Sequence, residues 1–155
     1  MPKGQKFKKK LVTKAVDIWQ KTWNSSEKGR FCHSIIPKVS LINWFHGLKL
    51  AWSGIIIINR IIANHTSSKS SQNRFNIVDD PICECTKNYE TVDHKLFECD
   101  SCSQDSRINL LVALEKTKAP KPYCIREILA IFIPEKNVNI IREICEFIVV
   151  NNISI

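Results

Sequence analysis

Residues 83–99 read CECTKNYETVDHKLFEC, which places Cys83, Cys85, His94 and Cys99 at the spacing C-x-C-x8-H-x4-C. Three thiols and one imidazole are a ligand set that zinc favours, because Zn²⁺ binds sulfur and nitrogen tetrahedrally. Four protein ligands also leave no open position for a substrate or an activated water. The stretch therefore predicts a zinc-stapled binding module rather than a zinc enzyme.

The spacing of the last two candidate ligands constrains the local structure. His94 and Cys99 are five positions apart, or about 500° of rotation in an α-helix, so they do not share one helix face. We expect a short helix over residues 91–98 that ends before Cys99 and lets its thiol fold back toward the metal. Asp93 and Asp100 are expected to orient the imidazole.

Cysteine usage in the rest of the chain supports a metal site. Seven cysteines is an odd number, the first residues are lysine-rich rather than leader-like, and apolar runs such as 54–58 are too short for a membrane. We expect an intracellular protein of the nucleus and/or cytoplasm, not secreted, with no membrane partner. Thiols are reduced there, and clustered Cys and His are more often metal ligands than disulfides. Cys102 is a competing fourth ligand, whereas Cys32, Cys124 and Cys145 are expected to pack in the core. The alternative to metal binding for the cluster is that its cysteines, too, are small buried residues of the core.

Positive charge is concentrated at the N-terminal end. Residues 1–30 hold nine lysines and arginines against two acidic residues, a net charge of +7, whereas the whole chain has +8. Such a block suits a phosphate backbone, and a solvated helix face is the alternative. The predicted nucleic-acid contacts, to RNA or DNA, are Lys8, Lys9, Lys10, Lys14 and Arg30. Trp19 and Trp23 offer base-stacking faces or, alternatively, core packing.

Apolar periodicity predicts a mainly α fold, a small helical domain with the zinc knuckle in its middle. The single domain over 1–155 would comprise a basic amphipathic helix (1–30), a helical lead-in (31–74), the knuckle (75–105) and C-terminal helices (106–155). Gly54 is expected to separate two helices of the lead-in, Ser40 to cap the first, and Pro37 to impose extended structure before it. The polar run over residues 67–73 is expected to be a linker or a short helical turn. The predicted helices cover residues 6–23, 40–52, 55–65, 91–98, 107–116, 125–132 and 138–148.

Catalytic signatures are missing from the sequence. It has four glycines and neither a phosphate-cradling glycine loop nor a G-x-S-x-G elbow. Its carboxylates lack the spacing that two-metal nucleases and polymerases need. We therefore expect no enzymatic activity from these residues.

The order of motifs resembles the C-terminal region of the reverse-transcriptase polyprotein of non-LTR (LINE-type) retrotransposons, of the arthropod kind. The resemblance covers essentially the whole chain, and its most specific part is the terminal CCHC knuckle. The blocks that carry it are Trp19-Gln20 with Trp23, Lys28-Gly29-Arg30, Ile35-Ile36-Pro37, Trp44-Phe45, Arg60-Ile61, Asn64-His65, Asp80 to Cys85, Glu90-Thr91, Asp93-His94, Leu96-Phe97, Cys99, Arg107 and residues 144–155.

The resemblance implies that Cys83, Cys85, His94 and Cys99 bind Zn²⁺. It further implies a module that assists RNA or target-DNA handling in target-primed reverse transcription. This sequence departs from the family pattern at Asn64 and Thr86, where glycine is usual, and it lacks the family's polymerase, endonuclease and RNase H acidic motifs. Two alternatives stay open: a structural module that packs on an upstream polymerase domain, and a genomic remnant without function.

Overall fold

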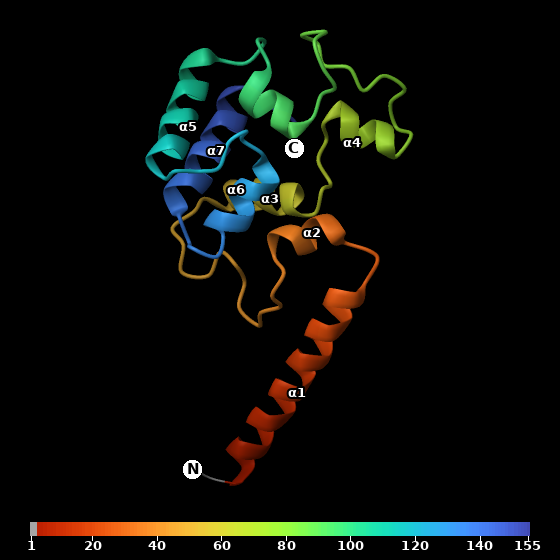
Figure 1. Ribbon diagram of the computed structural model, residues 1–155, viewed down its shortest axis with the longest axis vertical. Coiled ribbons are helices and arrows are strands. Elements are labelled where there is room, and N and C mark those ends of the chain that lie inside the picture. Colours follow the sequence, from red (N-terminus) through yellow and green to blue (C-terminus); the bar gives the residue numbers. More distant parts are fainter. Residues whose placement is uncertain (1–2) are drawn as a thin grey trace.

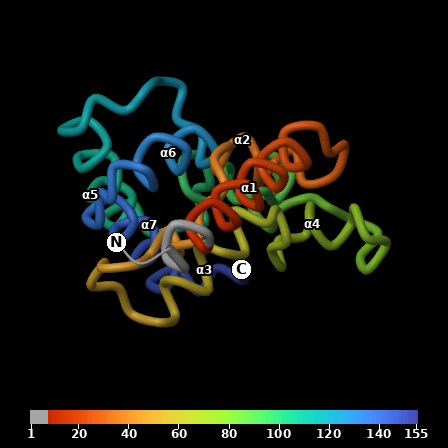
Figure 2. Tube along the Cα trace, turned by 90° about the horizontal axis from the view of Figure 1, so that it is seen from below, coloured from red at the N-terminus to blue at the C-terminus, as the bar shows by residue number. Residues whose placement is uncertain are grey.

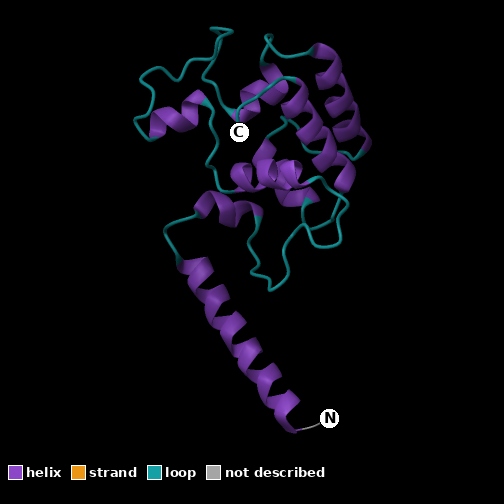
Figure 3. Ribbon diagram, turned by 180° about the vertical axis from the view of Figure 1, so that it is seen from behind, coloured by secondary structure: helices purple, strands orange, loops and turns teal. Residues whose placement is uncertain are grey.

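A computed structural model describes residues 3–155, with side chains from Lys8 onward; Met1 and Pro2 of the predicted domain lie outside the described residues. Over this range the regular structure is helical, and β-structure is limited to one antiparallel bridge between Ile82 and Tyr89 (Figure 3). The prediction of a mainly α fold is confirmed. The helices are α1 (Lys3–Ser25), α2 (Arg30–Ile35), α3 (Trp52–Ile62), α4 (Lys69–Arg74), the π-helical turn η1 (His94–Glu98), α5 (Gln104–Lys116), α6 (Ile125–Phe132) and α7 (Val138–Val150).

The hydrophobic core lies around α7. Helix α5 runs alongside α7, and α3, α6 and η1 also pack against it (Figure 1). The predicted helices over 107–116, 125–132 and 138–148 are all present. In α6 and α7 the apolar residues recur every three or four positions and form one buried face. In α5 they are divided, because Leu110 and Leu114 are buried whereas Ile108 and Val112 are exposed. The fully buried side chains of these three helices are Leu110, Leu114, Ile128, Leu129, Ile140, Ile141, Ile144 and Phe147.

Helix α1 projects away from the rest of the molecule (Figures 1 and 2). Only its C-terminal part is tied down: Gln20 Nε2 donates to the carbonyl of Pro37 at 2.9 Å, and Trp23 Nε1 donates to the carbonyl of Ile36 at 3.0 Å. Further toward the N-terminus, Leu11 and Ile18 are 53% and 58% exposed. The predicted amphipathic helix is confirmed, and from Lys8 onward the rest of the chain leaves its apolar residues Leu11, Ile18 and Trp19 exposed.

Residues 40–51 differ from the prediction, because they form turns instead of a helix. The Ser40 hydroxyl accepts the N–H of Ile42 at 3.0 Å, which closes a local turn rather than capping a helix. Gly47 has φ +79°, a left-handed conformation that interrupts any helix. Trp44 does not belong to a helix face. Its Nε1 donates to Asn59 Oδ1 at 2.8 Å and so fixes the loop on α3.

Two further expectations for the lead-in are wrong. Helix α2 continues to Ile35, so the extended structure expected before Pro37 is confined to Ile36, at φ −123° and ψ 77°. Gly54 lies inside α3 rather than before it. A Cβ at Gly54 would lie 3.2 Å from Cys145 Sγ, so this glycine permits the close approach of α3 to α7.

Helix α4 forms within the polar run that was expected to be a linker or a short helical turn. The Ser68 hydroxyl caps it by accepting the N–H of Ser71 at 3.4 Å. Glu90, just before η1, accepts the N–H of Lys69 through its carboxylate at 3.1 Å and that of Ser70 through its carbonyl at 3.2 Å. These bonds fasten α4 to the segment that leads into residues 91–99.

None of the helices in residues 3–155 combines the length and the apolar character needed to cross a lipid bilayer.

Candidate metal centre

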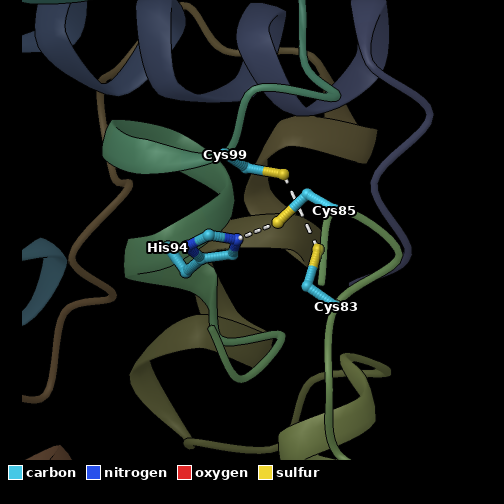
Figure 4. Close-up of side chains that lie close together, drawn as sticks. All are labelled: Cys83, Cys85, His94 and Cys99. Carbon is cyan, nitrogen blue, oxygen red and sulfur yellow. Dashed lines mark hydrogen bonds between the residues drawn. The ribbon is translucent and has the colours of Figure 1, made fainter. Parts of the chain in front are cut away.

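The structure brings Cys83, Cys85, His94 and Cys99 together, as the sequence predicts (Figure 4). Their candidate ligand atoms all lie within 4.8 Å of one another. Cys83 Sγ and Cys99 Sγ are 3.6 Å apart, and Cys85 Sγ is 3.1 Å from His94 Nε2. Two thiolates on one tetrahedral zinc, each about 2.3 Å from the ion, lie about 3.8 Å apart. The four side chains therefore fit a single metal ion.

A tight loop presents the first two cysteines. The N–H of Cys83 donates to the carbonyl of Asn88 at 2.9 Å, and the N–H of Thr86 donates to the carbonyl of Cys83 at 2.8 Å. The second bond closes a turn around Glu84 and Cys85. This turn directs both thiols to the same side in spite of the one-residue spacing between them (Figure 4).

Thr86 completes that turn in the left-handed conformation, at φ +61°. A β-branched residue rarely adopts this conformation, and the cost is about 1–3 kcal/mol. The structure thus explains why glycine suits this position. Asn64, the other departure, is also left-handed at φ +53°, but asparagine tolerates this region much better.

Replacing Thr86 with glycine is expected to raise the free energy of unfolding by about 1 kcal/mol, because the strain released exceeds the extra chain entropy of glycine. Chemical denaturation of the zinc-loaded protein measures this. Asn64→Gly is the matched control, with a change of only a few tenths of a kcal/mol. A less stable Thr86→Gly protein would contradict the assignment of strain.

The imidazole and the last thiol come from the π-helical turn η1 and the residue that comes after it. The N–H of Cys99 donates to the carbonyl of His94 at 2.8 Å, a bond that spans five residues. Cys99 itself is extended, at φ −70° and ψ 118°. The prediction that the helix ends before Cys99 is confirmed, and the wide turn brings the thiol back beside the imidazole.

Glu98 orients the imidazole, which corrects the prediction for Asp93 and Asp100. His94 Nδ1 lies 3.3 Å from Glu98 Oε2, so Nε2 faces the thiols. Asp93 turns the other way and accepts the N–H of Ile125 at 2.6 Å, while Asp100 pairs with Lys87 at the surface. A carboxylate on Nδ1 holds the tautomer in which Nε2 is free to bind a metal.

Arg107 holds the backbone of η1 from behind and was not recognised as a site residue from the sequence. Its side chain is 5% exposed, and Nε donates to the carbonyl of Leu96 at 3.1 Å. The other end of the guanidinium donates to the carbonyls of Lys95, at 3.4 Å, and of Cys99. The local sequence does not distinguish Arg107 from a surface arginine, because its burial depends on the folded chain.

The ionisation of two thiols in the cluster favours a bound cation. Burial raises the pKa of Cys99, but hydrogen bonds from Ser101 and the neighbouring thiols outweigh it and bring the pKa down to about 6. A hydrogen bond from the backbone of Lys87 lowers the pKa of Cys85, whereas burial raises the pKa of Cys83. Two of the three thiols are thus disposed to become thiolates, the form that binds metals.

The other cysteines lie outside the cluster. Cys102 is buried in the core beside it but does not belong to the group of atoms that can surround one ion. Cys32, Cys124 and Cys145 are half-buried at separate places, and all seven thiols are free. Packing therefore accounts for these four residues.

The predicted nucleic-acid contacts are spread over one exposed helix and its end. Lys8, Lys9, Lys10 and Lys14 are exposed on the projecting part of α1, away from the metal cluster (Figure 1). Arg30 is exposed but already donates to the carbonyls of Asn24 and Ser26, at 2.9 and 2.8 Å, so it caps the C-terminal end of α1. Trp19 is 47% exposed, whereas Trp23 is half-buried against His33.

Comparison with known proteins connects the chain to mobile elements. Over 97 residues, 62% of the chain, it is 30% identical to the retrovirus-related Pol polyprotein from type-1 retrotransposable element R1 of Bradysia coprophila. The chain contains a region related to non-LTR retrotransposon polyproteins. It spans 9% of the length of that relative. No protein-family model matches the chain, and no solved structure does.

Proposed function

We propose that this chain is a zinc-stabilised, non-catalytic nucleic-acid-binding module of a retrotransposon reverse transcriptase, which aids the handling of RNA or target DNA in target-primed reverse transcription. The observation that carries the proposal is the buried cluster of Cys83, His94 and Cys99, which are 1%, 3% and 0% exposed, with half-buried Cys85. A closed set of four ligands stabilises a fold and leaves no position for catalysis. The relationship to the R1 polyprotein supplies the context.

The nucleic-acid contacts in this proposal come from α1. Its lysines stand on an exposed helix that projects from the body, where they can follow a phosphate backbone without disturbing the core. Contacts of this kind release counterions, so the logarithm of the affinity falls with the logarithm of the salt concentration by about 0.9 per phosphate neutralised on a duplex. They give little sequence discrimination.

Replacing Lys9 and Lys10 with alanine is expected to reduce the salt slope of duplex binding by about 2, because two phosphate contacts are lost. Gel-shift titrations at several salt concentrations measure the slope. The matched control is Lys116→Ala with Lys118→Ala, which removes two exposed lysines from the end of α5. Binding that is independent of salt would contradict the assignment of the phosphate contacts to α1. An equal reduction of the salt slope in both double variants would contradict it as well.

The second candidate is a structural module whose α1 packs on an upstream polymerase domain. The observation in its favour is the apolar stripe of Leu11, Ile18 and Trp19, which are 53%, 58% and 47% exposed. The same experiment separates the two. A zinc-loaded chain that binds no nucleic acid, but gains solubility when co-expressed with the upstream polypeptide, would favour the structural role.

A further inference from the structure

An open cavity of about 260 Å³, lined by both apolar and polar side chains, lies beside residues 91–93 and is not used by the metal cluster. Its walls come from the loop after α3, from α4, from residues 91–93 and from the first residue of α6. An engineered apolar cavity of about 150 Å³ accepts benzene, so this one has room for a larger planar ring. Phe31, Ile61 and Ile125 provide apolar walls suited to the faces of such a ring.

Hydroxyl groups line the rest of the cavity, and one of them lacks a partner. Ser71 is 8% exposed, and within residues 3–155 its Oγ has no hydrogen-bond partner. This Oγ is shielded from solvent beside the cavity, and a buried hydroxyl without a hydrogen bond costs free energy that a bond to a ligand would recover. The neighbouring hydroxyls belong to Thr66, Ser68, Ser70 and Thr91.

Asp93 gives the cavity a preference for hydrogen-bond donors. Its Oδ1 accepts the N–H of Ile125 at 2.6 Å, and its Oδ2 lies 3.9 Å from Cys124 Sγ. A carboxylate offers about four lone-pair sites, so acceptor capacity remains toward the cavity. An amino group is a suitable partner for this carboxylate.

Surfaces on which rings stack lie next to Arg74, which is one of the residues that line the cavity. Arg74 is exposed at the rim, and its guanidinium carbon lies 4.9 Å from the centroid of the Phe75 ring. Phe75 is 50% exposed and packs on His65, with their ring centroids 5.3 Å apart. Proteins hold splayed-out bases of single strands on such aromatic and guanidinium planes.

We propose that this cavity receives one unpaired nucleobase with an exocyclic amine from single-stranded nucleic acid, with the amine donating to Asp93. This inference rests on the proposed nucleic-acid binding. Cytosine presents the N4 amine that carboxylates accept from, whereas uracil presents a carbonyl oxygen at the same edge. The pocket therefore discriminates between bases, while the lysines of α1 bind the backbone without discrimination.

Binding of oligocytidine and oligouridine of equal length, followed by fluorescence anisotropy at one salt concentration, tests the pocket. We expect oligocytidine to bind about tenfold more tightly. Asp93→Asn keeps an oxygen for the N–H of Ile125 but turns an amide donor toward the base, so it abolishes the preference. Asp79→Asn, at an exposed carboxylate outside the cavity, keeps it.

A second variant guards against loss of folding as an explanation. Ser71→Ala removes a hydroxyl that has no partner, so we expect an unchanged or higher melting temperature together with weaker oligocytidine binding. In parallel, titration with free cytidine is expected to shift the backbone NMR signals of Ser71 and Thr91, and uridine is not. Zinc content is checked for every variant.

The outcomes separate this inference from the proposed function. Equal affinity for both oligonucleotides, or a preference that survives both Asp93→Asn and Ser71→Ala, overturns the pocket, while salt-dependent binding through α1 would stand. Shifts by cytidine alone, without oligonucleotide binding, would support the pocket and overturn the proposed function. If the protein binds no oligonucleotide and cytidine shifts no NMR signals, both the pocket and the proposed function are overturned.

Discussion

Removing the metal from the Cys83, Cys85, His94 and Cys99 cluster is expected to lower the melting temperature of this protein by at least about 10–20 °C. Metal binding to structural Cys/His sites contributes about 10–16 kcal/mol to folding in zinc-finger peptides, as much as the whole stability of a typical domain. Cys83 and Cys99 also belong to the same buried core as Leu96 and the residues of α5 and α7. Losing even about 5 kcal/mol corresponds to this shift in a chain of this size.

Thermal unfolding followed by circular dichroism, with and without a zinc chelator, measures the effect, and elemental analysis establishes the metal content. Cys83→Ser is expected to melt like the chelated protein and to be insensitive to chelator. Cys32→Ser makes the same chemical change at a half-buried thiol on α2, outside the cluster, and is expected to keep both zinc and chelator sensitivity. Purified protein without zinc, or with a melting curve unaffected by chelation, would refute the metal centre.

Apolar periodicity predicts the helices that bury one regular face. It fails where contacts between distant residues determine the local structure. Helix α7 is predicted because its apolar residues repeat at helical spacing against the core. The same spacing around Trp44 is misleading, since that indole is used to bond Asn59 across fifteen residues of chain. Gly54 is predicted to separate two helices, yet it lies within α3 where that helix contacts α7. Neither contact leaves a trace in local sequence.

The clustering of the four candidate ligands is predictable from the sequence, whereas the residues that position them are not. Ligand identity and spacing identify the cluster, and the five-residue offset between His94 and Cys99 already requires the helix to end. The orienting carboxylate depends on the exact turn: in η1 Glu98 comes beside the imidazole, and Asp93 is drawn to the N–H of Ile125 from a segment 32 residues away. Arg107 likewise acts across eight to twelve residues, on carbonyls that any sequence would supply.

Arg107 is the second position at which a single substitution should have a large effect. Its guanidinium serves three carbonyls of the turn that carries His94 and Cys99, and it lies 5.9 Å from the centroid of the Phe147 ring on α7. Hydrogen bonds from a charged donor contribute about 1.5–3 kcal/mol each. The carbonyl of Cys99 also accepts the N–H of Cys102 at 3.2 Å, so it keeps one donor when Arg107 is removed. No neighbouring side chain among the described residues donates to these same carbonyls through a side-chain hydrogen bond.

Arg107→Ala is therefore expected to lower the free energy of unfolding by about 3–5 kcal/mol. It is also expected to weaken zinc affinity by about 10–100-fold, the usual cost of losing a group that orients metal ligands. Denaturant titration of the zinc-loaded protein measures the first quantity, and competition with a chromophoric chelator measures the second. For both quantities, Arg107→Lys should give values between those of the unchanged protein and of Arg107→Ala, because one ammonium does not reproduce the planar fork that spans several carbonyls.

Arg126→Ala is the matched control, since that arginine is 47% exposed on α6 and meets only Glu127 at 3.7 Å. An exposed pair of this kind contributes less than about 1 kcal/mol, so both stability and zinc affinity should stay close to those of the unchanged protein. If Arg107→Ala lost stability but kept full zinc affinity, Arg107 would be a core residue and no more. Stability and zinc affinity should fall together if Arg107 acts through the carbonyls of Lys95, Leu96 and Cys99, because these hold His94 and Cys99 in register with the loop of Cys83 and Cys85.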